Sequence, residues 1–576
     1  MLTDAIRLFF RNKLINIILI AAALVVNIRM CQYSHNIMNY SDECTSFDLL
    51  EASFDFAFFL FVVILLCSYT ACFSIQQAGI DEQISFRSSL RFKAYMLSLI
   101  AIIILCFCAA MLAWNIGTMA RLNRFDRELL FVIIKSCLLY FFLYAVLACA
   151  CGVLISSIKG RNRSYACLLL VCFVFGPLPE RIADGCSTLT NHLSQITDWF
   201  TVGPRQLFYA LTDTKVGIST VPELFALTLL WILAICLILA GKKRRWWLSL
   251  SLLAGILVCA FFYSNAPWGN VCIGGSPKNA MSYLREYYEL PGSPVRQEAA
   301  DFKVQRYDMK LKVRNNLSAT VHIYVDDTKK DSYHFTLYHQ YHIKKVLDNQ
   351  KNALDYTVDG DYLTVKNNGA LSYITIIYEG SAGGYYAYSE GIMLPSELCF
   401  YPVAGWQKIY DEANYSLAVR ANDERVDFRI SVDAGRKVFC NLAATSYNTF
   451  EGQASSVTLL AGYLKEAVYH DVTIVYPDYA PPCSSDEATI KATVDSLYEI
   501  EKEHAADAKY SVRGKTIFVS QPPAYPEYIF KDDHIQIPFL LPDGGKSIAE
   551  PYYTHFLDTG KNSSKILRGT ADESNE

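Results

Sequence analysis

The sequence predicts a multi-domain protein, in which an all-α polytopic membrane domain precedes a mainly antiparallel β-sandwich-like domain with a small α/β C-terminal part. Three observations predict this fold class. Long apolar runs are concentrated before about residue 265, apolar and polar residues alternate after Pro267, and helical periodicity replaces that alternation after Ser485. We expect the following parts: a membrane domain at 1–265, a β domain at 267–480, an α/β segment at 484–558 and a disordered tail at 559–576.

The membrane domain is predicted from about seven apolar stretches. A helix that crosses a bilayer needs about 20 apolar residues. Runs such as Tyr95–Ala113 contain no charged residue, which is rare in the core helices of soluble proteins. The expected spans are 14–28, 54–75, 94–116, 129–155, 164–178, 223–240 and 246–264, of which the first and fifth are short.

The residues before the first span have the pattern of a short helix that lies in the inner membrane interface. Apolar and charged side chains fall on opposite helical faces, with Leu2, Ile6, Phe9 and Phe10 on one and Asp4, Arg7 and Arg11 on the other. The alternative is a simple extension of the first span.

Basic residues predict the orientation, because cytoplasmic loops of membrane proteins are enriched in lysine and arginine. With the N-terminus inside, the inner segments carry these clusters: Arg7, Arg11 and Lys13; Arg87, Arg91 and Lys93; Lys159, Arg161 and Arg163; and Lys242, Lys243, Arg244 and Arg245. The last cluster is the strongest topology anchor, since it fixes the inner ends of two spans together. An odd number of spans then puts the chain after Ser264 outside the cytoplasm. The expected location of the protein is a bacterial cell (plasma) membrane.

The predicted spans carry almost no ionisable residue near their centres, with Lys135 close to an outer end. Gradient-driven transporters usually carry buried carboxylates along their pathway, so this favours a permease driven by a separate motor. The chain itself encodes no ATPase. A phosphate-binding loop requires G-x-x-x-x-G-K-[ST], and the nearest match, Gly544–Ser547, has Leu540 at the first glycine position.

The inner loop between the second and third spans reads QQAGIDEQISFRSSLRFK over residues 76–93. This loop resembles the cytoplasmic loop of type-2 ABC transporter permeases, although the usual threonine and proline are missing. In that family the loop forms a coupling helix that docks on the ATPase. The resemblance implies these coupling-loop candidates: Gly79, Asp81, Glu82, Arg87, Arg91 and Lys93. An ordinary basic inner loop is the alternative.

The same resemblance implies the partners of the chain. A cytoplasmic ATP-binding subunit would hold the ATP, so we expect no cofactor on this chain. The permease would pair with a second copy, as a homodimer, or with another permease, as a heterodimer, within membrane lipid. Nucleic acid is excluded as a partner, because the net charge is -4 and no basic stripe with interleaved aromatic residues occurs.

The sequence after Pro267 predicts an antiparallel sheet or sandwich, because period-2 runs are separated by turn signals such as Asp359-Gly360-Asp361. The expected strands are 305–313, 320–325, 362–365, 373–378, 415–421, 427–433, 457–461 and 472–476. A helix is expected at about 485–506, with strands at 516–520 and 534–539 after it.

Several phrases in this half follow one another in a recognisable order: Tyr307-x-Met-x-Leu-x-Val, Phe335-x-Leu-Tyr-His-Gln-Tyr, Ile374-x-Ile-x-Tyr-x-Gly and Phe400-Tyr-Pro. Together they resemble the N-terminal β-domain of aminopeptidase-N-like (gluzincin) zinc metallopeptidases. Residues after Ser485 resemble the start of the catalytic domain of those enzymes. The resemblance covers about 270 residues.

The catalytic residues of that family do not carry over. Zinc peptidases use H-E-x-x-H on a helix, and no His-Glu dipeptide occurs in this chain. If Glu550 matches the general base, the two ligand positions are Ala549 and Tyr553. The Gly-x-Met-Glu-Asn substrate loop is also missing. We therefore expect no catalytic residue, no metal ligand and a truncated, non-catalytic domain that binds substrate or a partner.

Three histidines that are close in sequence raise the question of a metal site. His334, His339 and His342 lie in a strand-like run in which His339 faces away from the other two. Over one strand, His334 and His342 would be about 26 Å apart. We expect surface histidines without a shared metal.

The sequence thus favours the membrane-spanning permease subunit of an ABC-type exporter. A membrane-anchored binding or sensor protein without transport is the first alternative, and a membrane metallopeptidase is the second.

Overall fold

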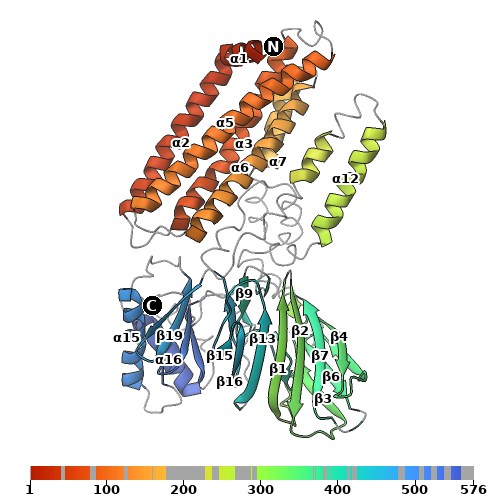
Figure 1. Ribbon diagram of the computed structural model, residues 1–576, viewed down its shortest axis with the longest axis vertical. Helices are drawn as coiled ribbons and strands as arrows, with labels where there is room; N and C mark the ends of the chain where they lie inside the picture. Colours follow the sequence, from red (N-terminus) through yellow and green to blue (C-terminus); the bar gives the residue numbers. More distant parts are fainter. Residues whose placement is uncertain are drawn as a thin grey trace, which may run out of the picture. The chain divides into compact units, whose positions relative to one another are not determined.

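The computed structural model describes most of both predicted halves (Figure 1). The described residues are 2–39, 46–77, 86–121, 127–158, 160–176, 228–236, 246–265, 287–288, 295–314, 316–367, 369, 371–380, 385, 387–388, 391–411, 416–417, 424–462, 464–477, 487–504, 511–519, 528–537 and 546–559. They divide into two compact units, one with the helices up to residue 265 and one with every described strand. We call these the helical unit and the outer unit.

The helical unit consists of helices, most of which are long and apolar. They are α1 (Leu2–Arg11), α2 (Lys13–Asn39), α3 (Ser46–Gln77), α5 (Phe86–Arg121), α6 (Arg127–Ser156), α7 (Arg161–Val174) and α12 (Trp246–Asn265), and residues 228–236 are also helical. Among the described residues, Lys13–His35 and Phe58–Gln77 are long and apolar enough to cross a membrane. The apolar stretches of α5, α6 and α12 are shorter. A helical N-terminal region with two candidate spans is thus confirmed, and the count of seven stays a prediction.

Helix α1 is separate from α2, as the amphipathic pattern predicts. The side chain of Asn12 accepts hydrogen bonds from the backbone N–H groups of Leu14 and Ile15, at 3.1 and 3.4 Å, and so caps the first turn of α2. Its amide donates to the Ser74 hydroxyl of α3 at 2.8 Å. This corner rules out α1 as a simple continuation of the first span.

Helices α3 and α6 pack closely because small residues meet where they cross. Ala148 and Gly152 are one turn apart on α6, and a Cβ on Gly152 would lie 2.0 Å from the Ser68 hydroxyl of α3. The Ser68 hydroxyl lies 3.4 Å from the Ala148 carbonyl oxygen. Small residues four apart are a common basis of helix packing in membranes.

The outer unit contains several sheets. Its strands are β1 (Val304–Val313), β2 (Leu317–Val325), β3 (Ser332–Thr336), β4 (Tyr341–Leu347), β5 (Tyr356–Asp359), β6 (Tyr362–Lys366), β7 (Ile374–Gly380), β8 (Ala387–Tyr388), β9 (Gly391–Leu394), β10 (Val403–Ala404), β11 (Tyr410–Asp411), β12 (Ser416–Leu417), β13 (Val426–Asp433), β14 (Phe439–Cys440), β15 (Ala443–Ser446), β16 (Thr449–Ala454), β17 (Leu459–Ala461), β18 (Leu464–Tyr469), β19 (Val472–Pro477), β20 (Thr516–Val519), β21 (Ile529–Phe530) and β22 (His534–Ile537).

The largest sheet has the order β15-β16-β13-β1-β2-β7-β4, and all its pairings are antiparallel except β1 with β13. Alternation sets its buried face. In β13, Val426, Phe428, Ile430 and Val432 are buried and the residues between them are exposed. The predicted turn at Asp359–Asp361 is confirmed, with Gly360 at φ 60, a conformation that glycine adopts without strain. A mainly antiparallel β region is confirmed.

The C-terminal part is α/β, as predicted. Its sheet has the order β18-β19-β20-β22-β21, and β19, β20 and β22 are parallel. Helix α15 (Glu487–His504) connects β19 to β20, as a crossover between parallel strands requires. It buries Ile490, Val494 and Leu497 at helical spacing. Helix α16 (Lys546–Thr559) follows β22 and also contributes to this core.

Two predicted strands differ from the structure. The run with the three histidines is not one strand, because β3 ends at Thr336 and β4 begins at Tyr341 in a different sheet. The strand expected at 415–421 is described only as β12, at 416–417.

Candidate functional site

The predicted coupling loop lies largely outside the described residues. Gly79, Asp81 and Glu82 are outside them, whereas Arg87, Arg91 and Lys93 belong to the first turns of α5, whose side chains are not described there. The topology anchors Lys242, Lys243, Arg244 and Arg245 also lie outside the described residues. Both sets of residues stay predictions.

Helix α16 carries Ala549, Glu550 and Tyr553, which the predicted resemblance would match to the zinc-binding motif. Ala549 and Tyr553 are buried in the C-terminal core, at 0% and 1% exposure. Glu550 points to the neighbouring helix, where its carboxylate lies 2.6 Å from Nε2 of His504. Ala549 and Tyr553 thus pack in the core of the C-terminal part.

Glu550 belongs to a small charged cluster between α15 and α16. Ligand atoms of Glu503, His504 and Glu550 lie within 4.8 Å of one another, the one such group of three among the described residues. The ammonium of Lys546 forms an ion pair with Glu503, and this hydrogen bond raises the pKa of Lys546. The Lys546–Glu503 ion pair and the contact between His504 and Glu550 thus join α16 to α15.

The structure places the three predicted histidines apart. His339 lies between β3 and β4, and its side chain is 8% exposed, so the prediction of a surface residue is wrong for it. Its Nδ1 lies 3.0 Å from Oδ1 of Asp361, which also accepts a hydrogen bond from the His339 backbone N–H at 2.8 Å. The hydroxyl of Tyr288 donates to Oδ2 of Asp361 at 2.9 Å.

The aromatic rings of two tyrosines pack around this buried carboxylate. The ring of Tyr287 stacks on that of His339, with ring centroids 3.5 Å apart, and Tyr288 stacks on Tyr410 at 5.0 Å. These tyrosines precede β1, so Asp361 anchors the start of the outer unit to its sheets. In this cluster both carboxylate oxygens of Asp361 accept hydrogen bonds, so the cluster has a structural role.

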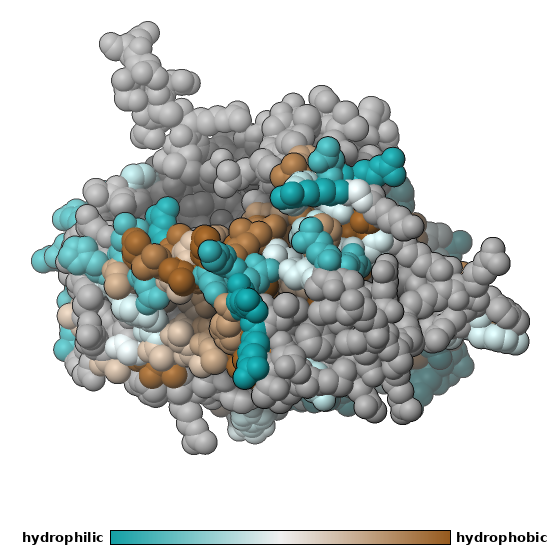
Figure 2. All heavy atoms as spheres, turned by 90° about the horizontal axis from the view of Figure 1, so that it is seen from above, coloured by the Kyte–Doolittle hydropathy of each residue, from teal (hydrophilic) through white to brown (hydrophobic). Residues whose placement is uncertain are grey.

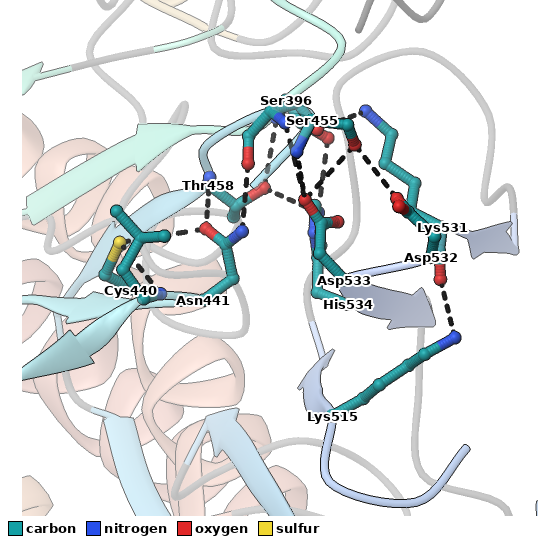
Figure 3. A network of polar contacts seen from close by, with 12 residues as sticks. Ser396, Cys440, Asn441, Ser455, Thr458, Lys515, Lys531, Asp532, Asp533 and His534 are labelled. Atoms are coloured by element: carbon teal, nitrogen blue, oxygen red, sulfur yellow. Dashed lines mark hydrogen bonds and ion pairs between the residues drawn. The ribbon is translucent and has the colours of Figure 1, made fainter. Parts of the chain in front are cut away.

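The most unusual polar site of the outer unit lies where the C-terminal sheet meets the β14-β17-β9-β8 sheet. An apolar seam of buried side chains joins the two sheets: Met393, Phe439, Leu460, Val475 and Phe518. Beside this seam, buried polar residues come together from the loop after β9, the β16–β17 loop and the start of β22 (Figure 3).

His534 is the centre of this network. Its Nδ1 lies 2.6 Å from Oδ1 of Asp533, and its Nε2 lies 3.0 Å from the Thr458 hydroxyl and 3.3 Å from the Ser396 hydroxyl. The backbone N–H of Ser455 donates to the other Asp533 oxygen at 3.0 Å. Burial alone would raise the pKa of Asp533, but His534 and Lys531 together hold it well below its usual range.

Two opposite charges lie deep in the same network. Glu397 is 4% exposed, and neither of its carboxylate oxygens accepts a hydrogen bond of ordinary geometry. Burial raises the pKa of Glu397, which the Lys531 ammonium only partly offsets, and burial lowers the pKa of Lys531. Lys531 donates to the Ser456 hydroxyl at 3.0 Å. Both shifts are caused chiefly by burial and favour the neutral forms of Glu397 and Lys531.

A hydroxyl, a histidine and an aspartate in series match the geometry of nucleophile, base and orienting acid in hydrolases. Here the His534 side chain is 0% exposed and that of Asp533 is 5% exposed. Ser396 and Thr458 are buried as well, so the described residues leave their hydroxyls out of reach of a substrate. The network therefore serves to lock two sheets together.

The sequence did not predict this network, because its members come from segments up to 138 residues apart. One local signal was present. Lys531-Asp-Asp-His534 is a run of charges directly before an apolar strand, and such a run is buried only when it has partners.

Comparisons with known proteins give a limited result. No family model and no curated protein matches the sequence. Among solved structures, an M1 zinc metallopeptidase from Deinococcus radiodurans is similar at 13% identity and a TM-score of 0.32, covering 44% of this chain and 64% of that one. A two-domain M1 zinc metallopeptidase mutant bound to L-arginine gives 13% identity and a TM-score of 0.30, with 43% and 63% covered. This chain thus spans less than two thirds of those structures, and the similarity is too low to assign it to their family.

Proposed function

We propose that this chain is the membrane-spanning permease subunit of an ABC-type exporter, powered by a separate ATPase subunit. In this proposal the seven predicted spans form the permease, with the N-terminus in the cytoplasm of a bacterial cell. The outer unit lies outside the cytoplasm, is non-catalytic, and binds substrate or a partner. A second permease, identical or different, completes the pathway.

The observation that carries the proposal is the packing of α3 inside a helical bundle. Most of the apolar stretch Phe58–Gln77 is buried, against α2, α5 and α6. A helix that only anchors a domain needs no such shielding. The close crossing of α3 and α6 at Ser68 and Gly152 also holds these two helices in one fixed geometry. A permease that changes conformation needs such rigid groups of helices.

The exposed surface of the bundle supports a membrane location. Large apolar side chains are exposed along α2, among them Ile17, Ile20 and Leu24, at 58–62% exposure. A soluble protein that exposed such a row would aggregate, whereas lipid covers it at no cost. The exposed leucines of α12, such as Leu250 and Leu257, are consistent with the same surroundings.

The non-catalytic outer unit is supported by α16, where Ala549 and Tyr553 are buried at the positions that would bind zinc. Stoichiometric zinc together with peptide hydrolysis by the purified full-length chain would contradict this part of the proposal.

The proposal predicts that a cytoplasmic ATPase co-purifies with the full-length chain from native membranes. Scrambling residues 80–86 should abolish the association or reduce ATP hydrolysis by the complex at least tenfold, because these residues are proposed to contact the ATPase. Scrambling residues 568–574, seven residues of the tail that the sequence predicts to be disordered, is the control of equal length and should change neither.

If no ATPase co-purifies and scrambling 80–86 leaves every activity of the complex unchanged, the exporter proposal is wrong. A membrane-anchored binding or sensor protein would then be the better description.

A further inference from the structure

The helical unit contains an apolar cavity of about 300 Å³ between α2, α3 and α5. Its walls are formed chiefly by apolar side chains such as Val26, Ile64 and Ile104, and Phe9 of α1 contributes from one end. Asn27 is the one amide side chain in the lining, and its Nδ2 already donates to the Ala23 carbonyl at 2.8 Å.

This cavity is partly open, because Ala23, Cys106 and Ala110 in its lining are exposed, and its lining is apolar. An apolar cavity of about 150 Å³ stays dry and takes up a benzene-sized molecule, and ligand pockets begin at about 300 Å³. Water inside would find few polar partners, namely Asn27, Trp114 and two cysteine thiols, and an unfilled cavity would forfeit dispersion contacts of its apolar lining. An apolar occupant is therefore expected.

The position of the cavity indicates which occupant that is. Both candidate membrane spans, Lys13–His35 and Phe58–Gln77, line it, and the outward face of α2 exposes a row of isoleucines and leucines. Hydrocarbon is thus the medium around these helices. In α1, Phe9 is buried while Arg7 and Arg11 are exposed beside it, which places basic groups at the end of the unit where phosphate headgroups lie.

The end-on view is consistent with this arrangement. Figure 2 looks onto the end of the helical unit and shows brown apolar side chains directly beside teal hydrophilic ones.

We propose that the cavity binds one acyl chain of a membrane phospholipid between α2, α3 and α5. The site would take hydrocarbon through its lining, and the exposed arginines of α1 would favour an anionic headgroup. Lipid binding in the cavity requires that the helices lie in a membrane, but it does not require the exporter mechanism. The two proposals can therefore fail independently.

The test uses the full-length protein in lipid nanodiscs that contain a phospholipid with a photoactivatable diazirine in mid-chain. After irradiation, mass spectrometry locates the cross-links. We expect adducts on the lining residues Ile64 and Ile104, which are only 4% and 5% exposed, at yields comparable to those on the exposed Leu24. Adducts confined to exposed residues, with none on the buried lining, would overturn the proposal.

Two neighbouring alanines of α2 provide a matched pair. Ala23 lines the cavity and Ala21 does not, although both are exposed. Ala23→Phe should reduce the cross-links to Ile64 and Ile104 at least fivefold, whereas Ala21→Phe should leave them unchanged. Equal yields in the two variants would contradict the proposal. Ala110→Phe fills the cavity from α5, so it gives the same readout if Ala23→Phe does not fold.

Discussion

Single buried polar residues decide how firmly the outer unit holds together. Asp361 illustrates this, because its two oxygens accept from the His339 backbone and the Tyr288 hydroxyl and also lie against the His339 ring. A buried carboxylate stabilises a fold when every donor around it is satisfied, and its removal leaves several buried donors without an acceptor.

We predict that Asp361→Ala lowers the local stability of the outer unit by about 3 kcal/mol, since buried donors lose their acceptor. Hydrogen–deuterium exchange of peptides from β3, β4 and β6 in the full-length protein would measure the loss. Asp359→Ala is the control two residues away. Its carboxylate pairs with Arg296 at the surface, so the expected loss is below about 1 kcal/mol. Equal losses would show that Asp361 is not the anchor.

Lys515 should give the outer unit a pH dependence of its own. Burial lowers its pKa from 10.5 to about 8, partly offset by Asp532 and Asp533. Between these two values the unfolded chain holds a proton that the folded chain has released, so stability rises with pH through this window. The gain would be about 3 kcal/mol between pH 8 and pH 10.5.

Chemical denaturation of wild type and Lys515→Met at pH 7 and pH 10 tests this prediction. The advantage of the methionine variant at pH 7 should shrink at pH 10, because deprotonation relieves the same penalty in wild type. Lys312→Met, at an exposed position of β1, should show no such change. A pH-independent difference for Lys515→Met would refute the assignment.

Residues of this kind were the part that the sequence could not predict. His334, His339 and His342 are close in sequence and suggested one strand, but the break at residues 337–340 buries His339 against Asp361. Ser396 and His534 are 138 residues apart and meet only through the packing of two sheets. No local pattern encodes such a meeting, because it depends on how whole sheets stack.

Elements were more predictable, since periodicity is a local property. Strands β1, β13 and β19 and helix α15 lie close to their predicted ranges, because alternating or helical burial sets each of them. Short strands such as β12 are set by their neighbours and were placed less well. In the helical unit the apolar runs predicted the helices. The packing of α3 against α6 was not predictable in this way, because it depends on the positions of glycine and alanine and not on hydropathy.

That crossing gives a prediction at the scale of two helices. A Cβ on Gly152 would lie 2.0 Å from the Ser68 hydroxyl and 2.9 Å from the Tyr69 backbone nitrogen. Gly152→Ala should therefore force α3 and α6 apart and lower the stability of the helical unit by about 2 kcal/mol. Thermal unfolding of the purified chain in detergent would measure it.

Gly117 of α5 is the matched control, because a Cβ there meets nothing within 4 Å. Gly117→Ala should leave the unfolding temperature unchanged or raise it, since alanine favours a helix by up to about 1 kcal/mol over glycine. If both variants behave alike, the α3–α6 contact does not depend on the small residue.

The whole molecule combines two units with opposite solvent requirements. The helical unit exposes apolar side chains on α2, α7 and α12, whereas charged residues such as Lys310, Lys312 and Arg429 cover one face of the largest sheet. One unit is suited to lipid and the other to water. A chain of this kind has a defined sidedness, and the basic clusters of its short loops predict it.

Thiol labelling of intact cells tests that sidedness. Lys329 is exposed in the outer unit and Lys13 is exposed at the start of α2. In a background without the native cysteines predicted to lie outside, a membrane-impermeant maleimide should label Lys329→Cys in intact cells, and Lys13→Cys only after the membrane is permeabilised. The reverse pattern would put the outer unit in the cytosol. An ATPase could not then reach the 76–93 loop from the cytoplasm, since that loop and the outer unit are predicted to lie on opposite sides of the membrane.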